Sequence, residues 1–91
     1  MAQSVVEIYT TPTCTYCLRA KEFLRGKNVT FEEIDVTKSK DFRDKMVLRT
    51  DGKRSVPQIF IDGKHVGGCD ALLELEENGF LDGLLFGGKW H

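Results

Sequence analysis

The feature that most constrains the fold is a pair of cysteines placed between a strand-like run and a helix-like run. Residues 5–9 are β-branched and aromatic, which is typical of a buried strand. Cys14 and Cys17 follow, and residues 15–27 have the apolar spacing of an amphipathic helix. A thiol at a helix start meets unpaired backbone N–H groups and the positive end of the helix dipole. Both favour the thiolate, and they can bring a cysteine pKa from about 8.5 into the range of roughly 3.5–7.5.

The helical spacing gives the two cysteines different surroundings. Cys17 shares one face with Ala20 and Leu24, which we expect to face the core. Cys14 lies at the exposed start of the helix. Because the thiolate is the attacking species in thiol–disulfide exchange, we expect Cys14 to attack and the shielded Cys17 to resolve the product. The motif therefore predicts a redox protein.

The middle of the chain predicts a parallel strand and a second helix. Residues 30–36 alternate like a strand, and a strand–helix–strand unit of this length is right-handed with parallel strands. Thr37 or Ser39 is expected to cap the second helix. This helix should carry Phe42 and Met46 inward, although its periodicity is weak.

The last third predicts a hairpin and a third helix. Residues 58–61 and 64–66 read as strands, and Asp62-Gly63 between them fits a type I′ turn. Asp70 is a natural N-cap for a helix over residues 71–78. The order βαβ-α-ββα predicts an α/β fold of the thioredoxin-like class, a four-stranded mixed β-sheet flanked by helices. C-x-x-C after the first strand strengthens that prediction.

Composition narrows the function classes. The chain has 91 residues, 13 basic and 14 acidic side chains and a net charge of −1, which predicts a single domain over residues 1–91 and argues against nucleic-acid binding. No apolar run approaches the ~20 residues that a membrane span needs. The start of the chain lacks the pattern of a signal peptide. Three cysteines are too few for a secreted disulfide scaffold, so we expect a cytoplasmic protein.

Three short motifs together resemble one known family. C-x-x-C alone is moderately specific, but all three motifs in this order make a strong signal. The chain resembles a glutaredoxin over nearly its whole length. Cys14-Thr15-Tyr16-Cys17 is similar to the family's C-P-Y-C site, Ser55-Val56-Pro57 to its T-V-P segment, and Gly67-Gly68-Cys69-Asp70 to its G-G-C-D segment.

The resemblance implies a glutathione-disulfide oxidoreductase. Cys14 would take glutathione from a protein–glutathione mixed disulfide, and a second glutathione would regenerate it. For protein disulfides, Cys17 would close a Cys14–Cys17 bridge that two glutathiones reduce. The expected partners are glutathione and glutathionylated or disulfide-containing proteins, and the protein is expected to be a monomer.

The resemblance also implies a glutathione site. A cis Pro57 would turn the Val56 backbone toward the cysteinyl unit of glutathione, and N–H groups at the next helix start would receive its γ-glutamyl carboxylate. Arg43 lies where the family often contacts the glycyl carboxylate, and Tyr16 is expected at the rim. Simpler roles remain for several of these, such as packing for Cys69 or a solvated surface for Arg43. The predicted binding residues are Thr11, Tyr16, Arg43, Val56, Pro57, Gly68, Cys69 and Asp70.

Departures from the family pattern leave alternatives open. Thr11 replaces a typical lysine, Ala71 a common acidic residue, and Thr15 the usual proline. Some family members without that proline bridge a [2Fe–2S] cluster as glutathione-bound dimers, so a cluster carrier that uses Cys14 as ligand is the main alternative. A partner of thioredoxin reductase is another. A zinc site of the two active-site cysteines with His65 and Cys69 has enough ligands, but it lacks a second closely spaced pair.

Overall fold

The computed structural model describes residues 3–87, which contain one four-stranded sheet. The strand order is β2-β1-β3-β4, with β1 parallel to β2 and antiparallel to β3, and with β3 antiparallel to β4. The predicted mixed sheet is therefore confirmed. The strands are β1 (Val6–Thr10), β2 (Glu32–Asp35), β3 (Gln58–Ile61) and β4 (Lys64–Gly67).

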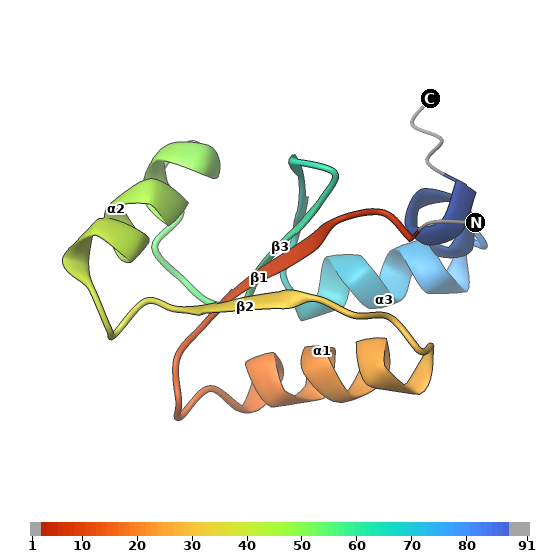
Figure 1. Cartoon of the computed structure of the whole chain (residues 1–91), viewed down its shortest axis with the longest axis horizontal. Coiled ribbons are helices and arrows are strands. Elements are labelled where there is room, and N and C mark those ends of the chain that lie inside the picture. The colour runs from red at the N-terminus through yellow and green to blue at the C-terminus, as the bar shows by residue number, and fades with distance from the viewer. Residues whose placement is uncertain (1–2, 88–91) are drawn as a thin grey trace.

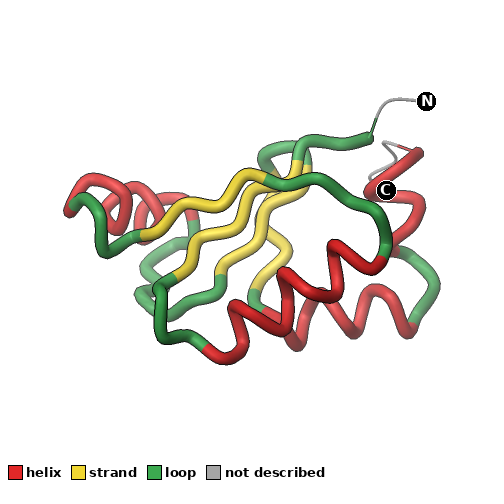
Figure 2. Tube along the Cα trace, turned by 60° about the horizontal axis from the view of Figure 1, so that its bottom comes forward, coloured by secondary structure: helices red, strands yellow, loops and turns green. Residues whose placement is uncertain are grey.

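Helices cover both faces of this sheet. Helices α1 (Thr15–Gly26) and α3 (Cys69–Glu77) lie on one face, and α2 (Lys40–Arg49) lies at the other (Figures 1 and 2). A short π-helix, η1 (Gly83–Gly87), follows α3, and its carbonyls at Leu84 and Leu85 accept hydrogen bonds from Ser4. Among the described residues, no helix has the length and apolar character needed to cross a membrane.

The core is divided by the sheet into two layers. Alternate strand residues point to opposite faces, so neighbouring positions of β1 and of β3 serve different layers. The larger layer, beneath α1 and α3, includes Ile8, Ala20, Leu24, Ile59, Ile61 and Leu72. The smaller layer, beneath α2, contains Tyr9, Val36, Met46 and Phe60.

Local signals in the sequence are confirmed at several ends of elements. The Ser39 hydroxyl caps α2 and accepts from the Asp41 N–H at 3.2 Å. Asp62 and Gly63 have φ values of 51° and 79°, as a type I′ turn requires. Strand β2 is shorter than residues 30–36, because the Thr30 N–H donates to the Gln3 side chain at 2.8 Å instead of joining the ladder with β1.

Two local predictions are wrong. Phe42 is 42% exposed while Met46 is fully buried, because the smaller core layer contacts the later part of α2, at Met46 and Val47, and not its first turn. Asp70 is not an N-cap. Gly68 takes the N-cap position of α3 with extended backbone and no side-chain cap, which puts Asp70 in the first turn.

Arg49 is the main polar tie between α2 and the sheet. Its guanidinium donates to the Glu7 carboxylate at 2.9 Å and to the Tyr9 hydroxyl at 3.0 Å. The same group lies 3.9 Å from the centre of the Phe60 ring. The hydrogen bond from Arg49 lowers the pKa of Glu7 below its ordinary 4.5. The contacts of Arg49 therefore help to hold α2 against the sheet, since the helix buries little apolar surface of its own.

We predict that Arg49→Met lowers the free energy of unfolding by about 2 kcal/mol near pH 7, since it leaves the half-buried Glu7 carboxylate without its partner. A lowered folded-state pKa stabilises above the unfolded pKa, and this contribution is lost as the pH falls through the folded value. The difference in the free energy of unfolding between wild type and variant should therefore decrease as the pH falls below 4.5. Urea denaturation at several pH values measures it. Lys40→Met, on the exposed side of the same helix, is the control and should change stability by less than about 0.5 kcal/mol. A gap that does not change with pH would contradict the assignment.

Candidate active site

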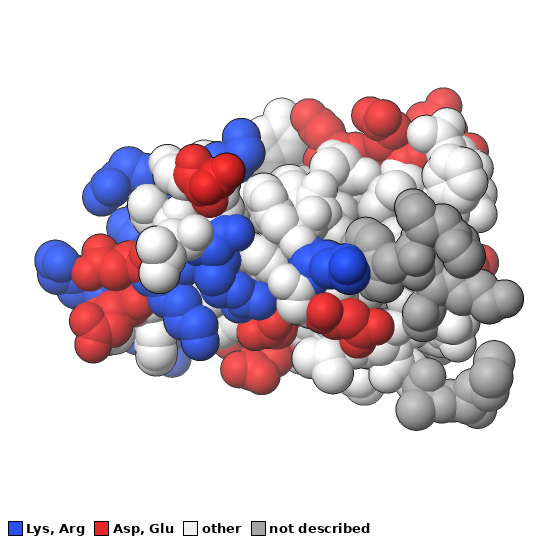
Figure 3. Space-filling view, turned by 90° about the horizontal axis from the view of Figure 1, so that it is seen from above, with Lys and Arg blue, Asp and Glu red and all other residues white. Residues whose placement is uncertain are grey.

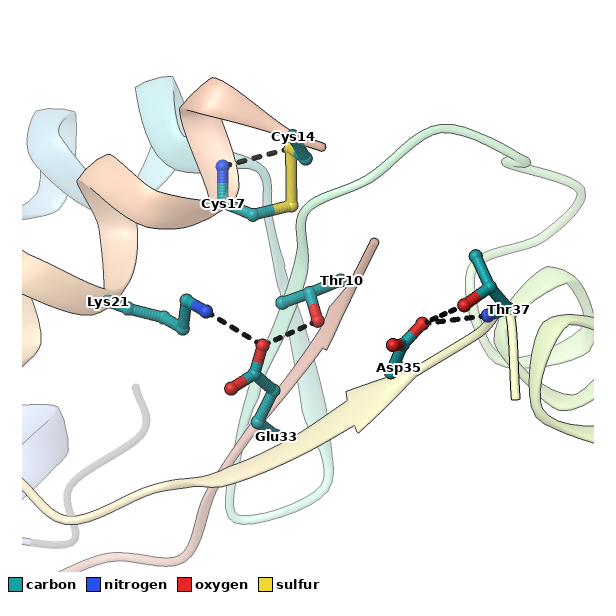
Figure 4. A network of polar contacts seen from close by, with 7 residues as sticks. All are labelled: Thr10, Cys14, Cys17, Lys21, Glu33, Asp35 and Thr37. Carbon is teal, nitrogen blue, oxygen red and sulfur yellow. Dashed lines mark hydrogen bonds and ion pairs between the residues drawn. A yellow bond between two sulfur atoms is a disulfide. The ribbon is translucent and has the colours of Figure 1, made fainter. Parts of the chain in front are cut away.

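Cys14 caps the N-terminus of α1. Its backbone is extended, at φ −84° and ψ 110°, and its Sγ accepts a hydrogen bond from the Cys17 N–H at 2.9 Å. The two cysteines are paired as a disulfide, with their Cα atoms 5.1 Å apart (Figure 4). Cys14 is half-buried, whereas Cys17 is only 1% exposed. The predicted contrast between an accessible and a shielded cysteine is confirmed.

The loop before β3 lies beside the cysteine pair. The Val56–Pro57 peptide bond is cis, as the family resemblance implied. The Val56 carbonyl oxygen is 3.8 Å from the Cys14 Sγ, so this loop and the start of α1 face each other. Pro57 itself is buried. The active-site disulfide is therefore bordered by backbone of the loop before β3.

Two glycines let the start of α3 approach this loop. A Cβ at Gly68 would lie 3.4 Å from the Pro57 carbonyl oxygen, close to the limit of van der Waals contact. Gly67 has φ 125°, which side-chain-bearing residues rarely adopt, and a Cβ there would lie 2.9 Å from the Ala71 Cβ. The helix start that follows offers N–H groups without intrahelical partners to an anion.

These segments enclose a pocket of about 500 Å³ beside the disulfide. Six of the residues predicted from the sequence line it, so the structure brings them together. They are Tyr16, Val56, Pro57, Gly68, Cys69 and Asp70. Two of the other lining residues belong to the family-like motifs and three lie near those motifs in the sequence, but none of the five is among the predicted binding residues. These are Lys53, Ser55, Gln58, Gly67 and Ala71.

Thr11 and Arg43 are not among the lining residues. The Thr11 carbonyl accepts from the Cys14 N–H at 3.3 Å and so shapes the turn before the helix. The Arg43 guanidinium donates to the Arg54 carbonyl at 2.9 Å. This contact joins α2 to the loop that leads to Val56. In this structure both residues hold backbone of the site in place.

A polar network lies next to the cysteine pair (Figure 4). The Glu33 carboxylate accepts from the Thr10 hydroxyl at 2.7 Å and from the Lys21 ammonium at 2.8 Å. The hydrogen bond from Lys21 lowers the pKa of Glu33. Lys21 lies one turn after Cys17 on α1, and Thr10 ends β1. The network therefore fixes the helix that carries the cysteines to the strands beneath it.

The third cysteine has a different environment. Cys69 is 3% exposed and packs in the larger core layer, and its burial raises the pKa of its thiol. His65 is also partly buried; its Nε2 lies 2.7 Å from the Gln58 side-chain oxygen, and burial lowers its pKa. Within residues 3–87, no three His, Cys, Asp or Glu side chains are grouped so that they could hold a metal ion. The four-ligand zinc set is thus not assembled in the described part of the chain.

Comparison with known proteins identifies the family. The sequence profile described as Glutaredoxin matches residues 6–66. The chain belongs to the glutaredoxin family. It is 52% identical over 81 residues to glutaredoxin 1 of Rickettsia felis, a match that covers 88% of this chain and 79% of that protein. As a member of this family with the Cys14–Cys17 pair, the protein is a thiol–disulfide oxidoreductase.

Solved structures agree on the thioredoxin-like fold. The solution structure of glutaredoxin from Brucella melitensis matches with a TM-score of 0.85 and 46% identity, covering 100% of this chain and 98% of the other. A crystal structure of a buckwheat glutaredoxin–glutathione complex matches with a TM-score of 0.80 and 30% identity, over 90% and 76% of the two chains. The predicted fold class is therefore confirmed.

We predict that Gly67→Ala lowers the free energy of unfolding by about 1–3 kcal/mol, because it forces a side chain into left-handed backbone and against Ala71. Gly26→Ala is the matched control. No atom lies within 4 Å of a Cβ at Gly26, which is the last residue of α1, so this change should be neutral or stabilise by up to about 1 kcal/mol. Chemical denaturation of both variants measures the difference. Equal effects would show that the glycine at 67 is not required by the backbone.

Proposed function

We propose that this glutaredoxin reduces protein–glutathione mixed disulfides and protein disulfides, with glutathione as the reductant. The observation that supports this most directly is a half-exposed Cys14 at a helix start, beside a pocket of about 500 Å³. Pockets of roughly 300–1,000 Å³ suit small-molecule ligands. The related buckwheat protein was solved as a complex with glutathione.

The proposed reaction begins at Cys14. Its thiolate attacks the glutathione sulfur of the mixed disulfide, a Cys14–glutathione disulfide forms, and the protein leaves as a thiolate that takes up a proton. A free glutathione thiolate then attacks the glutathione sulfur of this disulfide. Oxidised glutathione leaves and the Cys14 thiolate is restored. The unpaired N–H groups at the start of α1 stabilise the negative charge on Cys14 in both steps.

For a protein disulfide the second cysteine takes part. Cys14 attacks one sulfur and releases the other as a thiolate, which leaves the partner bound to Cys14. Cys17 then gives its proton to the released thiolate and attacks the Cys14 sulfur, freeing the partner's second thiolate and closing the disulfide. Two glutathiones reduce that disulfide and become oxidised glutathione. The structure holds the pair in the closed form, with the Cα atoms 5.1 Å apart, within the range of ordinary disulfides.

The pocket gives two parts of glutathione a proposed partner. The Val56 backbone would pair with the cysteinyl unit, and the N–H groups of Cys69 and Asp70 would receive the γ-glutamyl carboxylate. Tyr16, which is exposed, forms the rim beside Cys14. Thr11 supplies no charge where the family typically has lysine, so backbone N–H donors contribute a larger share of anion binding. We propose that the protein works as a cytoplasmic monomer.

We predict that Cys14→Ser reduces turnover of a glutathione mixed disulfide to the uncatalysed background. Cys17→Ser should retain most of that activity, because the mixed-disulfide route needs one cysteine, but it should lose reduction of a protein disulfide. A coupled assay that follows oxidised glutathione measures both reactions. Cys69→Ser is the control and should leave both activities near the wild-type level, since serine keeps the backbone N–H proposed to bind glutathione and the thiol that it replaces is buried. Activity that survives Cys14→Ser would overturn the proposal.

We propose iron–sulfur cluster transfer as a second candidate function, which one feature of the site supports. Cys14 is accessible at the edge of the pocket, and thiolates at such a position can ligate a [2Fe–2S] cluster. Each of two chains would contribute one Cys14, with glutathione thiolates completing the ligand set.

We predict that anaerobic reconstitution with iron, sulfide and glutathione yields a coloured dimer if this function exists. Absorbance spectra and gel filtration of the reconstituted wild type measure it. Cys14→Ser should give neither colour nor dimer, whereas Cys69→Ser should behave as the wild type. A wild-type protein that stays a colourless monomer would exclude the carrier function and leave the reductase proposal unaffected.

A further inference from the structure

The net charge is only −1, but basic and acidic side chains are concentrated in different segments of the chain. Residues 38–54 contain seven basic and three acidic side chains, whereas residues 62–87 contain one basic and six acidic side chains. In Figure 3 the lysine and arginine side chains gather over the end of the molecule where α2 lies. The molecule is therefore electrostatically polar although it is almost neutral overall.

The positive side reaches the active-site pocket. We define the basic rim as Lys40, Arg43, Lys53 and Arg54. Lys40 and Arg43 are three residues apart on α2 and so share one face of the helix. Arg43 contacts the Arg54 carbonyl at 2.9 Å, and Lys53 lines the pocket. These contacts make the rim continuous from α2 to the pocket that borders Cys14.

Few negative charges offset this rim. The Lys40 ammonium lies 2.8 Å from the Asp44 carboxylate, but these side chains are 86% and 53% exposed, so the pair is solvated and weak. Asp41 and Asp51 are also exposed in this segment, but the seven basic side chains of residues 38–54 outnumber its three acidic ones, so the segment keeps a net positive charge.

The opposite side of the pocket has the other sign. Asp70, in the first turn of α3, lines the pocket directly. Ala71 lines both this pocket and a neighbouring cavity of about 290 Å³, whose lining includes Glu74. The pocket thus lies between the basic rim and the acidic start of α3. An acidic partner that approaches Cys14 is attracted by the basic rim and repelled by the acidic side chains of α3.

We propose that the basic rim is a docking surface for an acidic stretch next to the reactive cysteine of a protein substrate. This rests on the proposed function and specifies its substrate class. In the mixed-disulfide reaction the glutathione part would fill the pocket, so the leaving protein would lie outside it, against residues that border the pocket, the basic rim among them. Asp and Glu residues beside its cysteine would face the basic rim, and neutral or basic residues would face α3. Charge complementarity of this kind raises association rates by about 10–10³-fold at low salt.

The test uses two glutathionylated peptides of equal length, one with glutamates and one with lysines around the cysteine. At low ionic strength we expect kcat/KM to be about tenfold higher for the acidic peptide. The preference should fall toward parity at about 1 M salt, where the Debye length is about 3 Å. Equal kcat/KM for the two peptides at low salt would overturn the docking surface.

Matched charge variants locate the effect. Lys40→Gln with Arg54→Gln removes two positive charges from the rim, and the preference for the acidic peptide should fall by about threefold. Arg25→Gln with Lys64→Gln removes the same charge from the last turn of α1 and from the β3–β4 hairpin, and it should leave the preference unchanged. Equal losses in both double variants would show that only net charge matters and would overturn the rim assignment.

A small mixed disulfide of glutathione and 2-mercaptoethanol, whose leaving thiol carries no charge, separates this inference from the proposed function. If the wild type reduces it but treats both peptides alike, the docking surface is overturned and the reductase remains. If the wild type reduces neither this compound nor either peptide, the proposed function itself is wrong and the inference falls with it.

Discussion

The hydrogen bond from the Cys17 N–H to the Cys14 sulfur joins the structure of this protein to its chemistry. N-cap positions are usually occupied by Ser, Thr, Asp or Asn, whose oxygen accepts from the first turn of the helix. Here a sulfur fills that place. The donor that helps to begin α1 is also a donor that favours a thiolate over a thiol. Helix initiation and nucleophile activation are therefore one interaction in this chain.

A reactive helix start must be held firmly, because a cap that frays would lose its orienting donors. Polar contacts hold both the helix α1 and the loop that faces it. The Glu33 carboxylate joins Lys21 of α1 to Thr10 at the end of β1, so the helix cannot shift along the sheet without breaking charge-assisted hydrogen bonds. On the facing loop, Arg43 holds the Arg54 carbonyl. Residues outside the pocket thus set the geometry inside it.

The predictability of the fold follows the strength of local signals. The helical spacing of Cys17, Ala20 and Leu24 is regular, and it correctly separated the buried cysteine from the accessible one. The apolar pattern of α2 is weak, and the burial predicted from it for Phe42 is wrong, because burial in this helix depends on which part of it packs against the sheet. Asp70 is not the cap because Gly68, two residues earlier, has the extended backbone of the N-cap position, which places Asp70 in the first turn of α3.

The site shows the same division between local and long-range information. The motif residues that line the pocket were predicted because three short motifs of the chain resemble those of a known family. Lys53 and Ala71 were not, since their place in the pocket depends on how a loop and a helix from different parts of the chain meet. The contact between Arg43 and the Arg54 carbonyl is of this kind too: a long side chain has many neighbours within reach, and only the packing of α2 selects one.

Burial divides the three sulfurs into distinct chemical roles. Cys14 is half-exposed, while Cys17 and Cys69 are 1% and 3% exposed. Thiol–disulfide exchange needs both a thiolate and access for the incoming disulfide. Cys69 has neither, because burial blocks access and raises its thiol pKa. Cys17 lacks access from solvent but is bonded to Cys14 as a disulfide, which is the placement that its proposed resolving role requires. In the proposed mechanism oxidising equivalents therefore enter this fold at one sulfur, and the proposed docking surface selects the partners that deliver them.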